Sequence, residues 1–148
     1  MKKPPNIENI KHHYAGIFIL TESGKIIGQK RDNKPDIDNP GKIGTFGGTV
    51  EMGETPVMGA WRELTQEETN LDLDINSFKP LFKDVKWREL TKEWEVVHFF
   101  TVDISNKQLS DLEIYEGDGW VCIDSPDNPD LIESWRPMIK RAFEIISN

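Results

Sequence analysis

The residues Glu63, Gln66 and Glu67 stand at positions i, i+3 and i+4 of a segment that the sequence predicts to be helical. These spacings place all three side chains on one face of an α-helix. Two neighbouring carboxylates repel each other unless a cation offsets their charge, and oxygen ligands of this kind suit Mg²⁺ or Mn²⁺. The pattern therefore indicates a divalent metal site with Glu63 and Glu67 as ligands.

Two glycines, Gly47 and Gly48, precede this helix. Because a glycine has no Cβ atom, its backbone can approach a neighbouring group closely. We expect the backbone here to aim a carbonyl, that of Gly48, at the same ion.

The segment GTVEMGETPVMGAWRELTQEETNL, residues 48–71, resembles the signature of the Nudix hydrolases. That signature is G-x5-E-x7-R-E-U-x-E-E-x-G-U, where U is a bulky aliphatic residue. It is matched at fixed spacing by Gly48, Glu54, Arg62, Glu63, Leu64 and Glu67. A second string, WRELTKE at 87–93, repeats six of the seven residues of WRELTQE at 61–67, but its counterparts of Gly48 and Glu54 are Asp74 and Pro80. We therefore interpret the second string as coincidental.

The motif departs from the family pattern at Gln66, Thr69 and Asn70, and two alignments stay open. In the first, an ungapped α-helix continues until Asn70 caps it and Leu71 packs. In the second, one residue is inserted, so that Glu67 and Glu68 form the glutamate pair. The second needs a bulge, because five residues is the wrong phase to bring Glu68 onto the face of Glu63. We prefer the first, which has one carboxylate fewer and predicts weaker metal binding or fewer ions.

The resemblance implies hydrolysis of a nucleoside diphosphate linked to another moiety, with Mg²⁺ as the cofactor and Mn²⁺ as the alternative. It implies that Arg62 pairs with Glu54 and holds the loop against the helix, while Gln66 either reaches the metal through water or has no role. Glu116, in a later loop, is expected to be a further ligand or the general base, with Glu113 and Asp118 as alternatives. The expected catalytic residues are then Glu67, Glu116 and Arg62.

Three residues are candidates for substrate binding. Arg31 ends a predicted strand and could meet a phosphate, whereas Phe46 and Trp94 could stack on a base. Each also has a plainer interpretation, as a surface arginine or as core aromatics. Marks of the ADP-ribose, dinucleotide, NADH and coenzyme A subfamilies are absent, which leaves nucleoside triphosphates, oxidised ones included, and nucleotide sugars. The alternative function is a catalytically weakened nucleotide-binding regulatory module.

The amino-acid composition limits which classes of molecule the protein could bind. The net charge of −8 over 148 residues argues against a nucleic-acid polymer but allows a small nucleotide bridged by a metal ion. No apolar run approaches the ~18 residues that span a membrane, and Cys122 is the only cysteine. We expect a cytoplasmic protein, and the sequence leaves open whether it forms a homodimer.

The elements that must position these residues alternate between strands and helices. Strands are predicted at 14–20, 26–31, 78–87 and 94–104 and from Trp120, with a loop at 32–44. Helices are predicted at 56–69, where Thr55 is the cap and Pro56 the first residue, and at 134–147. The second WREL string should form a hairpin tip. We expect one α+β domain over residues 1–148, an α/β/α sandwich with a mixed β-sheet between helices and a loose lead-in at 1–12.

Overall fold

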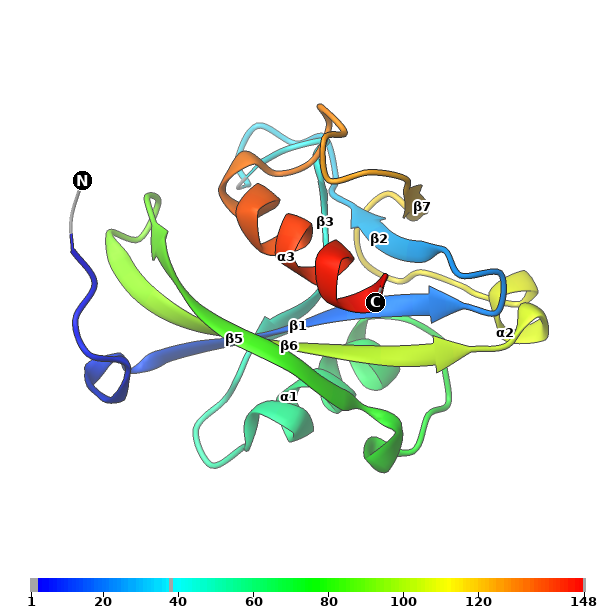
Figure 1. Ribbon diagram of the computed structural model, residues 1–148, viewed down its shortest axis with the longest axis horizontal. Helices are drawn as coiled ribbons and strands as arrows, with labels where there is room; N and C mark the ends of the chain where they lie inside the picture. Colours follow the sequence, from blue (N-terminus) through cyan, green and yellow to red (C-terminus); the bar gives the residue numbers. More distant parts are fainter. Residues whose placement is uncertain (1–2, 38, 148) are drawn as a thin grey trace.

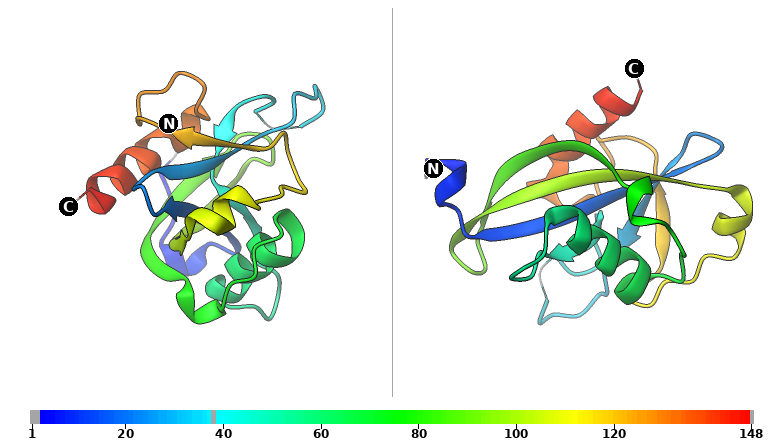
Figure 2. Two further views of the ribbon diagram at one scale, coloured as in Figure 1. Left: turned by 90° about the vertical axis from the view of Figure 1, so that its right-hand side faces the viewer. Right: turned by 90° about the horizontal axis from the view of Figure 1, so that it is seen from below.

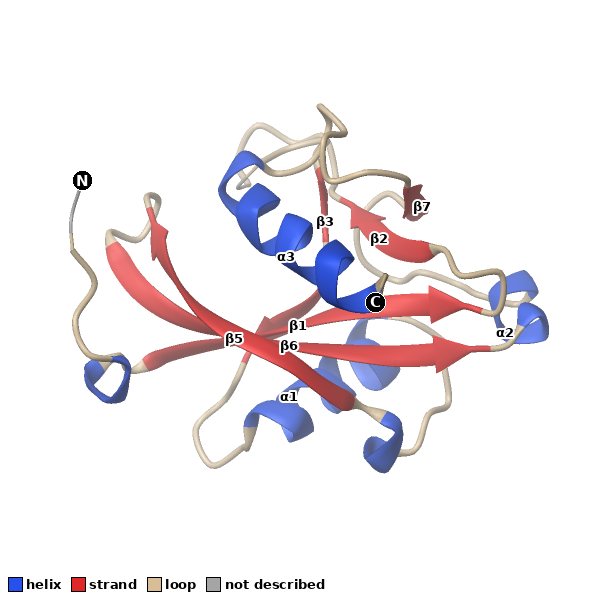
Figure 3. Ribbon diagram, in the orientation of Figure 1, coloured by secondary structure: helices blue, strands red, loops and turns tan. Residues whose placement is uncertain are grey.

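The computed structural model describes residues 3–37 and 39–147, and in these seven strands form one mixed sheet (Figures 1 and 3). Along the main path the order is β3-β2-β1-β6-β5, while β4 also pairs with β1 and β7 with β2. The strands are β1 (His12–Thr21), β2 (Ile26–Lys30), β3 (Ile43–Gly44), β4 (Phe46–Thr49), β5 (Lys79–Arg88), β6 (Glu93–Ile104) and β7 (Trp120–Ile123).

Helices cover both faces of the sheet. Helix α1 (Pro56–Arg62), continued by the π-helical segment η2 (Glu63–Glu68), lies on one face, and α3 (Arg136–Ile146) lies on the other (Figure 2). The short helix α2 (Asn106–Ser110) follows β6 at one end of the sheet. Three 3-10 turns complete the helical elements: Ile7–Asn9, Ile75–Ser77 and Glu133–Trp135. The predicted α+β sandwich is therefore confirmed.

The central strands β1 and β6 are apolar on both faces because both faces are covered. They pair in parallel from His12 with Glu95 to Thr21 with Ile104. Alternate residues enter different cores: Ile17 packs in the cluster beneath α1, and Phe18 packs in the cluster beneath α3. Parallel strands buried in this way typically read as continuous apolar runs, which is why the sequence identified them.

The start of α1 and the β5–β6 hairpin are formed as predicted. The Thr55 hydroxyl accepts a hydrogen bond from the Met58 N–H at 3.3 Å, and Pro56 is the first helical residue. The second WREL string places Trp87 and Arg88 at the end of β5, with the hairpin turn directly after them.

Other segments differ from the expectation. The predicted loop at 32–44 ends in the short strand β3, and α2 was not predicted. Residues 1–2 of the predicted loose lead-in lie outside the described residues. The described part is more ordered than expected, because Ile10 is 5% exposed and β1 begins at His12. In the part of the chain that the structure describes, no helix has the length and apolar character needed to cross a membrane.

Candidate functional site

The helix that carries the motif changes its hydrogen-bonding pattern within the motif. α1 ends at Arg62, and η2 continues as a π-helix in which the Thr69 N–H donates to the Leu64 carbonyl, five residues earlier, at 3.1 Å. The Thr69 hydroxyl donates to the same carbonyl at 2.7 Å. A π turn accommodates one extra residue without breaking the helix, and such turns are frequent at functional sites.

This π turn corrects the preferred alignment. The ungapped α-helix is wrong, and the arrangement is that of the second alignment, in which a bulge brings Glu68 inward. Glu68 is 1% exposed, and its Oε1 accepts a hydrogen bond from the Gly47 N–H at 2.8 Å. Leu71 is buried in the core beneath α1, whereas Gln66 is exposed and its amide donates a hydrogen bond to the neighbouring Thr65 hydroxyl at 3.2 Å.

Three carboxylates converge at this place: Glu63, Glu68 and Glu116. One oxygen from each lies within 4.8 Å of the others. Glu67 is exposed on η2, outside this group of three, but its charge raises the pKa of both Glu63 and Glu116 and so acts on the same cluster. The two alternatives to Glu116, Glu113 and Asp118, are exposed like Glu116 itself, but they lie outside this group of three. Asp118 lies 3.9 Å from Lys30 Nζ.

Burial and mutual repulsion shift the protonation of the cluster. Burial, together with the charges of Glu63 and Glu116, raises the pKa of Glu68 to about 9, although the Gly47 N–H and Gln29 oppose the shift. Burial is also the main cause that raises the pKa values of Glu63 and Glu116. Such a cluster is costly to ionise by itself, and a divalent cation is the natural group to offset its charge.

Gly47 and Gly48, on strand β4, let the backbone pass close to the carboxylate cluster and to β1. A Cβ atom at Gly48 would lie 2.3 Å from the Glu63 carboxyl carbon, and a Cβ atom at Gly47 would lie 2.0 Å from the Ala15 carbonyl oxygen. Gly47 also has a φ of 147°, in the region that favours glycine. Both positions therefore require glycine for β4 to approach the glutamates and β1.

Arg62 fastens the loop after β4 to the helix. Its Nε and Nη2 atoms donate to the two Glu54 carboxylate oxygens at 2.7 and 3.0 Å, and Nη2 also donates to the Thr49 carbonyl at 3.1 Å. Its Nη1 donates to Glu63 Oε1 at 3.1 Å. The hydrogen bond from Arg62 lowers the pKa of Glu54. Arg62 thus orients Glu63 and acts through it.

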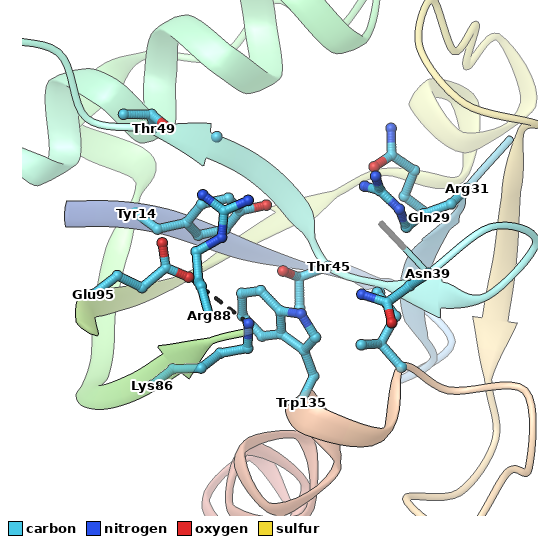
Figure 4. Close-up of a pocket in the computed structure, with 13 residues that line it drawn as sticks. Tyr14, Gln29, Arg31, Asn39, Thr45, Thr49, Lys86, Arg88, Glu95 and Trp135 are labelled. Carbon is cyan, nitrogen blue, oxygen red and sulfur yellow. Dashed lines mark ion pairs between the residues drawn. The ribbon is translucent and has the colours of Figure 1, made fainter. Parts of the chain in front are cut away.

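A pocket adjoins the carboxylate cluster on the face of the sheet that carries α3 (Figure 4). Gln29 connects the two places, because it hydrogen-bonds Glu68 and its Nε2 donates to the Glu116 carbonyl at 3.0 Å. Arg31 lines this pocket, as a phosphate-binding residue would. The other lining residues include Tyr14, Asn39, Thr45, Lys86, Arg88, Glu95 and Trp135.

The two aromatic candidates for base stacking lie elsewhere. Phe46 is fully buried in the core beneath α1, so its assignment to substrate binding is wrong. Trp94 packs against Trp87 with ring centroids 5.2 Å apart and lines a separate groove along the β5–β6 hairpin. Trp135 is the indole that reaches the pocket, and the sequence pattern assigned it only to the final helical segment.

Comparison with known proteins decides the family. The model of the NUDIX domain matches residues 11–142. The chain belongs to the NUDIX family. No curated protein matches its sequence. The matched region contains the whole carboxylate cluster, so the motif and the three-dimensional site lie in the same domain.

Solved structures of other proteins share the fold at low sequence identity. MutT protein from Methanosarcina mazei Go1 is 20% identical with a TM-score of 0.68, over 94% of this chain and 97% of that one. A MutT/nudix family protein from Listeria innocua is 20% identical with a TM-score of 0.68, over 94% of this chain and 96% of that one. The dihydroneopterin triphosphate pyrophosphohydrolase of E. coli is 16% identical with a TM-score of 0.67, over 95% of this chain and 100% of that one.

Proposed function

We propose that this NUDIX protein catalyses the divalent-metal-dependent hydrolysis of a nucleoside diphosphate linked to another moiety. The observation that carries the proposal is the convergence of Glu63 and Glu68, on the motif helix, with Glu116, from the loop before β7, so that one oxygen of each lies within 4.8 Å of the others beside a pocket. Family membership indicates a pyrophosphohydrolase and a small nucleotide substrate. The proposed ion is Mg²⁺, with Mn²⁺ as the alternative, because the donor set consists of hard oxygen atoms.

The donor set fits a divalent ion. Glu63 and Glu68 would hold it from η2, with the Gly48 carbonyl and Glu116 completing the set, and Glu67 would approach from the exposed side. Such an ion neutralises phosphate oxygens and makes water a better nucleophile near neutral pH. Arg62 is a positioning residue, since it holds the Glu63 carboxylate in place. Glu116 and Glu67, both exposed to solvent, are the candidates for the general base.

Substrate class follows from the pocket and from the sequence. Arg31 would contact a phosphate that the metal does not neutralise, and the remaining pocket would receive the group beyond it. We propose a nucleoside triphosphate, oxidised or not, or a nucleotide sugar. The E. coli structural relative named as a triphosphate pyrophosphohydrolase favours the triphosphate. A cytoplasmic nucleotide pool is the corresponding location.

The alternative, a weakened regulatory module, rested on Gln66 in place of a glutamate and on Thr69 in place of the motif glycine. The π turn argues against this alternative, because it is consistent with one inserted residue, Gln66, and with Glu67 and Glu68 as the glutamate pair. The experiment is a hydrolysis panel of nucleoside triphosphates, oxidised triphosphates, nucleotide sugars and dinucleotides with and without Mg²⁺. We expect Mg²⁺-dependent turnover of one class that is lost in Glu68→Gln and kept in Glu113→Gln. A folded protein that binds metal but hydrolyses none of the panel would contradict the proposal.

A further inference from the structure

The pocket beside the carboxylate cluster contains a buried pair of opposite charges, Lys86 and Glu95. Lys86 Nζ lies 3.9 Å from Glu95 Oε1, and Glu95 is 2% exposed. Glu95 Oε2 lies 3.1 Å from His12 Nε2, yet it completes no hydrogen bond to any residue that the structure describes. The carboxylate thus faces Lys86 with one oxygen and His12 with the other, and each oxygen has a second lone pair that a ligand in the pocket could use.

The register of the β5–β6 hairpin explains why this pair exists. Lys86 and Glu95 are directly opposite each other across the two antiparallel strands, so their side chains share a face of the sheet. Trp135 comes from the other side, at the start of α3, and Lys86 Nζ lies 4.9 Å from the centre of its ring. Figure 4 shows the indole between the Lys86–Glu95 end of the pocket and the Arg31–Gln29 end.

The size of the pocket limits what can enter it. Its volume is about 180 Å³. Sites that enclose a drug-sized ligand typically measure about 300–1,000 Å³, so this pocket accommodates one part of a nucleotide rather than all of it. A flat ring placed against Trp135 would have its edge at Lys86 and Glu95 and its phosphates toward Arg31 and the carboxylate cluster.

Resting on the proposed function, we propose that Glu95 and Lys86 determine specificity by reading a 2-amino-4-oxopyrimidine edge, the chemistry shared by guanine and pterins. This edge carries two adjacent N–H donors, which a carboxylate accepts together, beside a carbonyl oxygen, which an ammonium group donates to. Adenine and cytosine offer one amino group and a ring acceptor, and hypoxanthine lacks the amino group. The edge of guanine or a pterin therefore satisfies the pair most completely.

A phosphate is the competing occupant, because Lys86 and Arg88 both line this pocket. Glu95 offsets part of the positive charge that Lys86 and Arg88 bring to this end, so a phosphate here would face a carboxylate as well as two cations, while Arg31 lies at the other end of the pocket. The Lys86–Glu95 end favours a neutral ring edge with donors and an acceptor. Arg31, at the opposite end of the pocket, is the group that would contact the phosphate chain.

The test is equilibrium binding by calorimetry of GMP, IMP and AMP, which differ only at the ring and contain no pyrophosphate to hydrolyse. A bidentate contact should make GMP bind about 5- to 150-fold more tightly than IMP. Neopterin monophosphate in a fourth titration distinguishes the sources, because tighter binding than GMP assigns the pocket to a pterin and weaker binding assigns it to guanine. Equal affinities for GMP and IMP, or no binding of either GMP or neopterin monophosphate, would overturn the proposal.

Two variants separate this role from a merely structural one. Glu95→Gln keeps the shape of the side chain but replaces one of its two acceptor oxygens by an amino group. It should reduce the ratio of GMP affinity to IMP affinity to about one. The thermal midpoint of the variant shows whether the protein is folded. Glu93→Gln is the matched control, because Glu93 also contacts His12, at 3.5 Å, but does not line the pocket. A ratio preserved in Glu95→Gln would refute the inference. A GMP preference without Mg²⁺-dependent hydrolysis of any triphosphate or nucleotide sugar would instead refute the proposed function.

Discussion

Replacing Glu68 by glutamine should change how the stability of the metal-free protein depends on pH. The folded pKa of Glu68 is about 9, well above the ordinary value of 4.5, chiefly because the carboxyl group is buried and faces Glu63 and Glu116. A raised carboxyl pKa means that the folded state holds a proton that the unfolded state releases. The stability that neutral, buried Glu68 contributes to the folded protein is thus fully present below pH 4.5 and is lost as the pH rises toward about 9.

The size of the effect follows from the same shift. Between pH 4.5 and about pH 7, Glu68 stays protonated in the folded protein but is ionised in the unfolded chain. The free energy of unfolding therefore falls by ~1.4 kcal/mol per pH unit, or about 3 kcal/mol over these roughly 2.5 units. Glutamine carries no such cost, and its amide oxygen can still accept the Gly47 hydrogen bond. The unfolding free energy of Glu68→Gln, relative to wild type, should therefore rise by about 3 kcal/mol across this range.

Urea unfolding in the presence of a chelator, at a series of pH values, measures this difference. Glu113→Gln is the matched control, since it removes an exposed carboxylate that lies outside the cluster. We expect the control to follow the wild-type pH dependence while Glu68→Gln departs from it. A difference between Glu68→Gln and wild type that stays constant with pH would refute the reasoning, because Glu68 would then not be held neutral in the folded protein.

Three further predictions concern the geometry around the cluster. Arg62→Lys should lower kcat more than it raises KM, and should cost about 1.5–3 kcal/mol in denaturant unfolding, because one ammonium group cannot replace the hydrogen bonds to Glu54 and Glu63; unchanged kinetics would contradict this. Gly47→Ala should lower the thermal midpoint much more than Gly53→Ala, because a Cβ atom meets the Ala15 carbonyl at the first position and nothing within 4 Å at the second; equal losses would contradict it. Deletion of Gln66 should convert η2 to α-helix and leave metal binding intact, since the deletion removes the additional residue of the π turn; loss of metal binding in a folded variant would show that the turn itself is required.

Much of the fold could be predicted from local patterns. Strands β1 and β6 are apolar because both of their faces are covered, and the start of α1 follows from Thr55 and Pro56. Those signals belong to the chain itself and do not depend on distant contacts. The two conformations of the WREL string were also predictable, because only the first copy has a cap and a proline before it.

Other features depended on tertiary contacts that no local pattern carries. The π turn turns Glu68 inward, where its carboxylate accepts a hydrogen bond from the Gly47 N–H on strand β4. This contact is distant in the sequence, so the sequence alone favoured the wrong alignment. Phe46 was considered for base stacking because an aromatic residue in a strand can face either way, and it is in fact buried. Lys86 and Glu95 become a pair only through the register of the hairpin, for which alternation along β5 and β6 was the available signal.

The central claim is that Glu63, Glu68 and Glu116 together hold the metal ion that the proposed chemistry needs. Titration of Mn²⁺ into the metal-free protein, followed by electron paramagnetic resonance of the free ion, tests it most directly. Wild type and Glu113→Gln should bind Mn²⁺ alike, whereas Glu68→Gln and Glu116→Gln should each bind it at least about tenfold more weakly. Wild-type affinity in Glu68→Gln would contradict the claim and would place the metal site away from the buried end of η2.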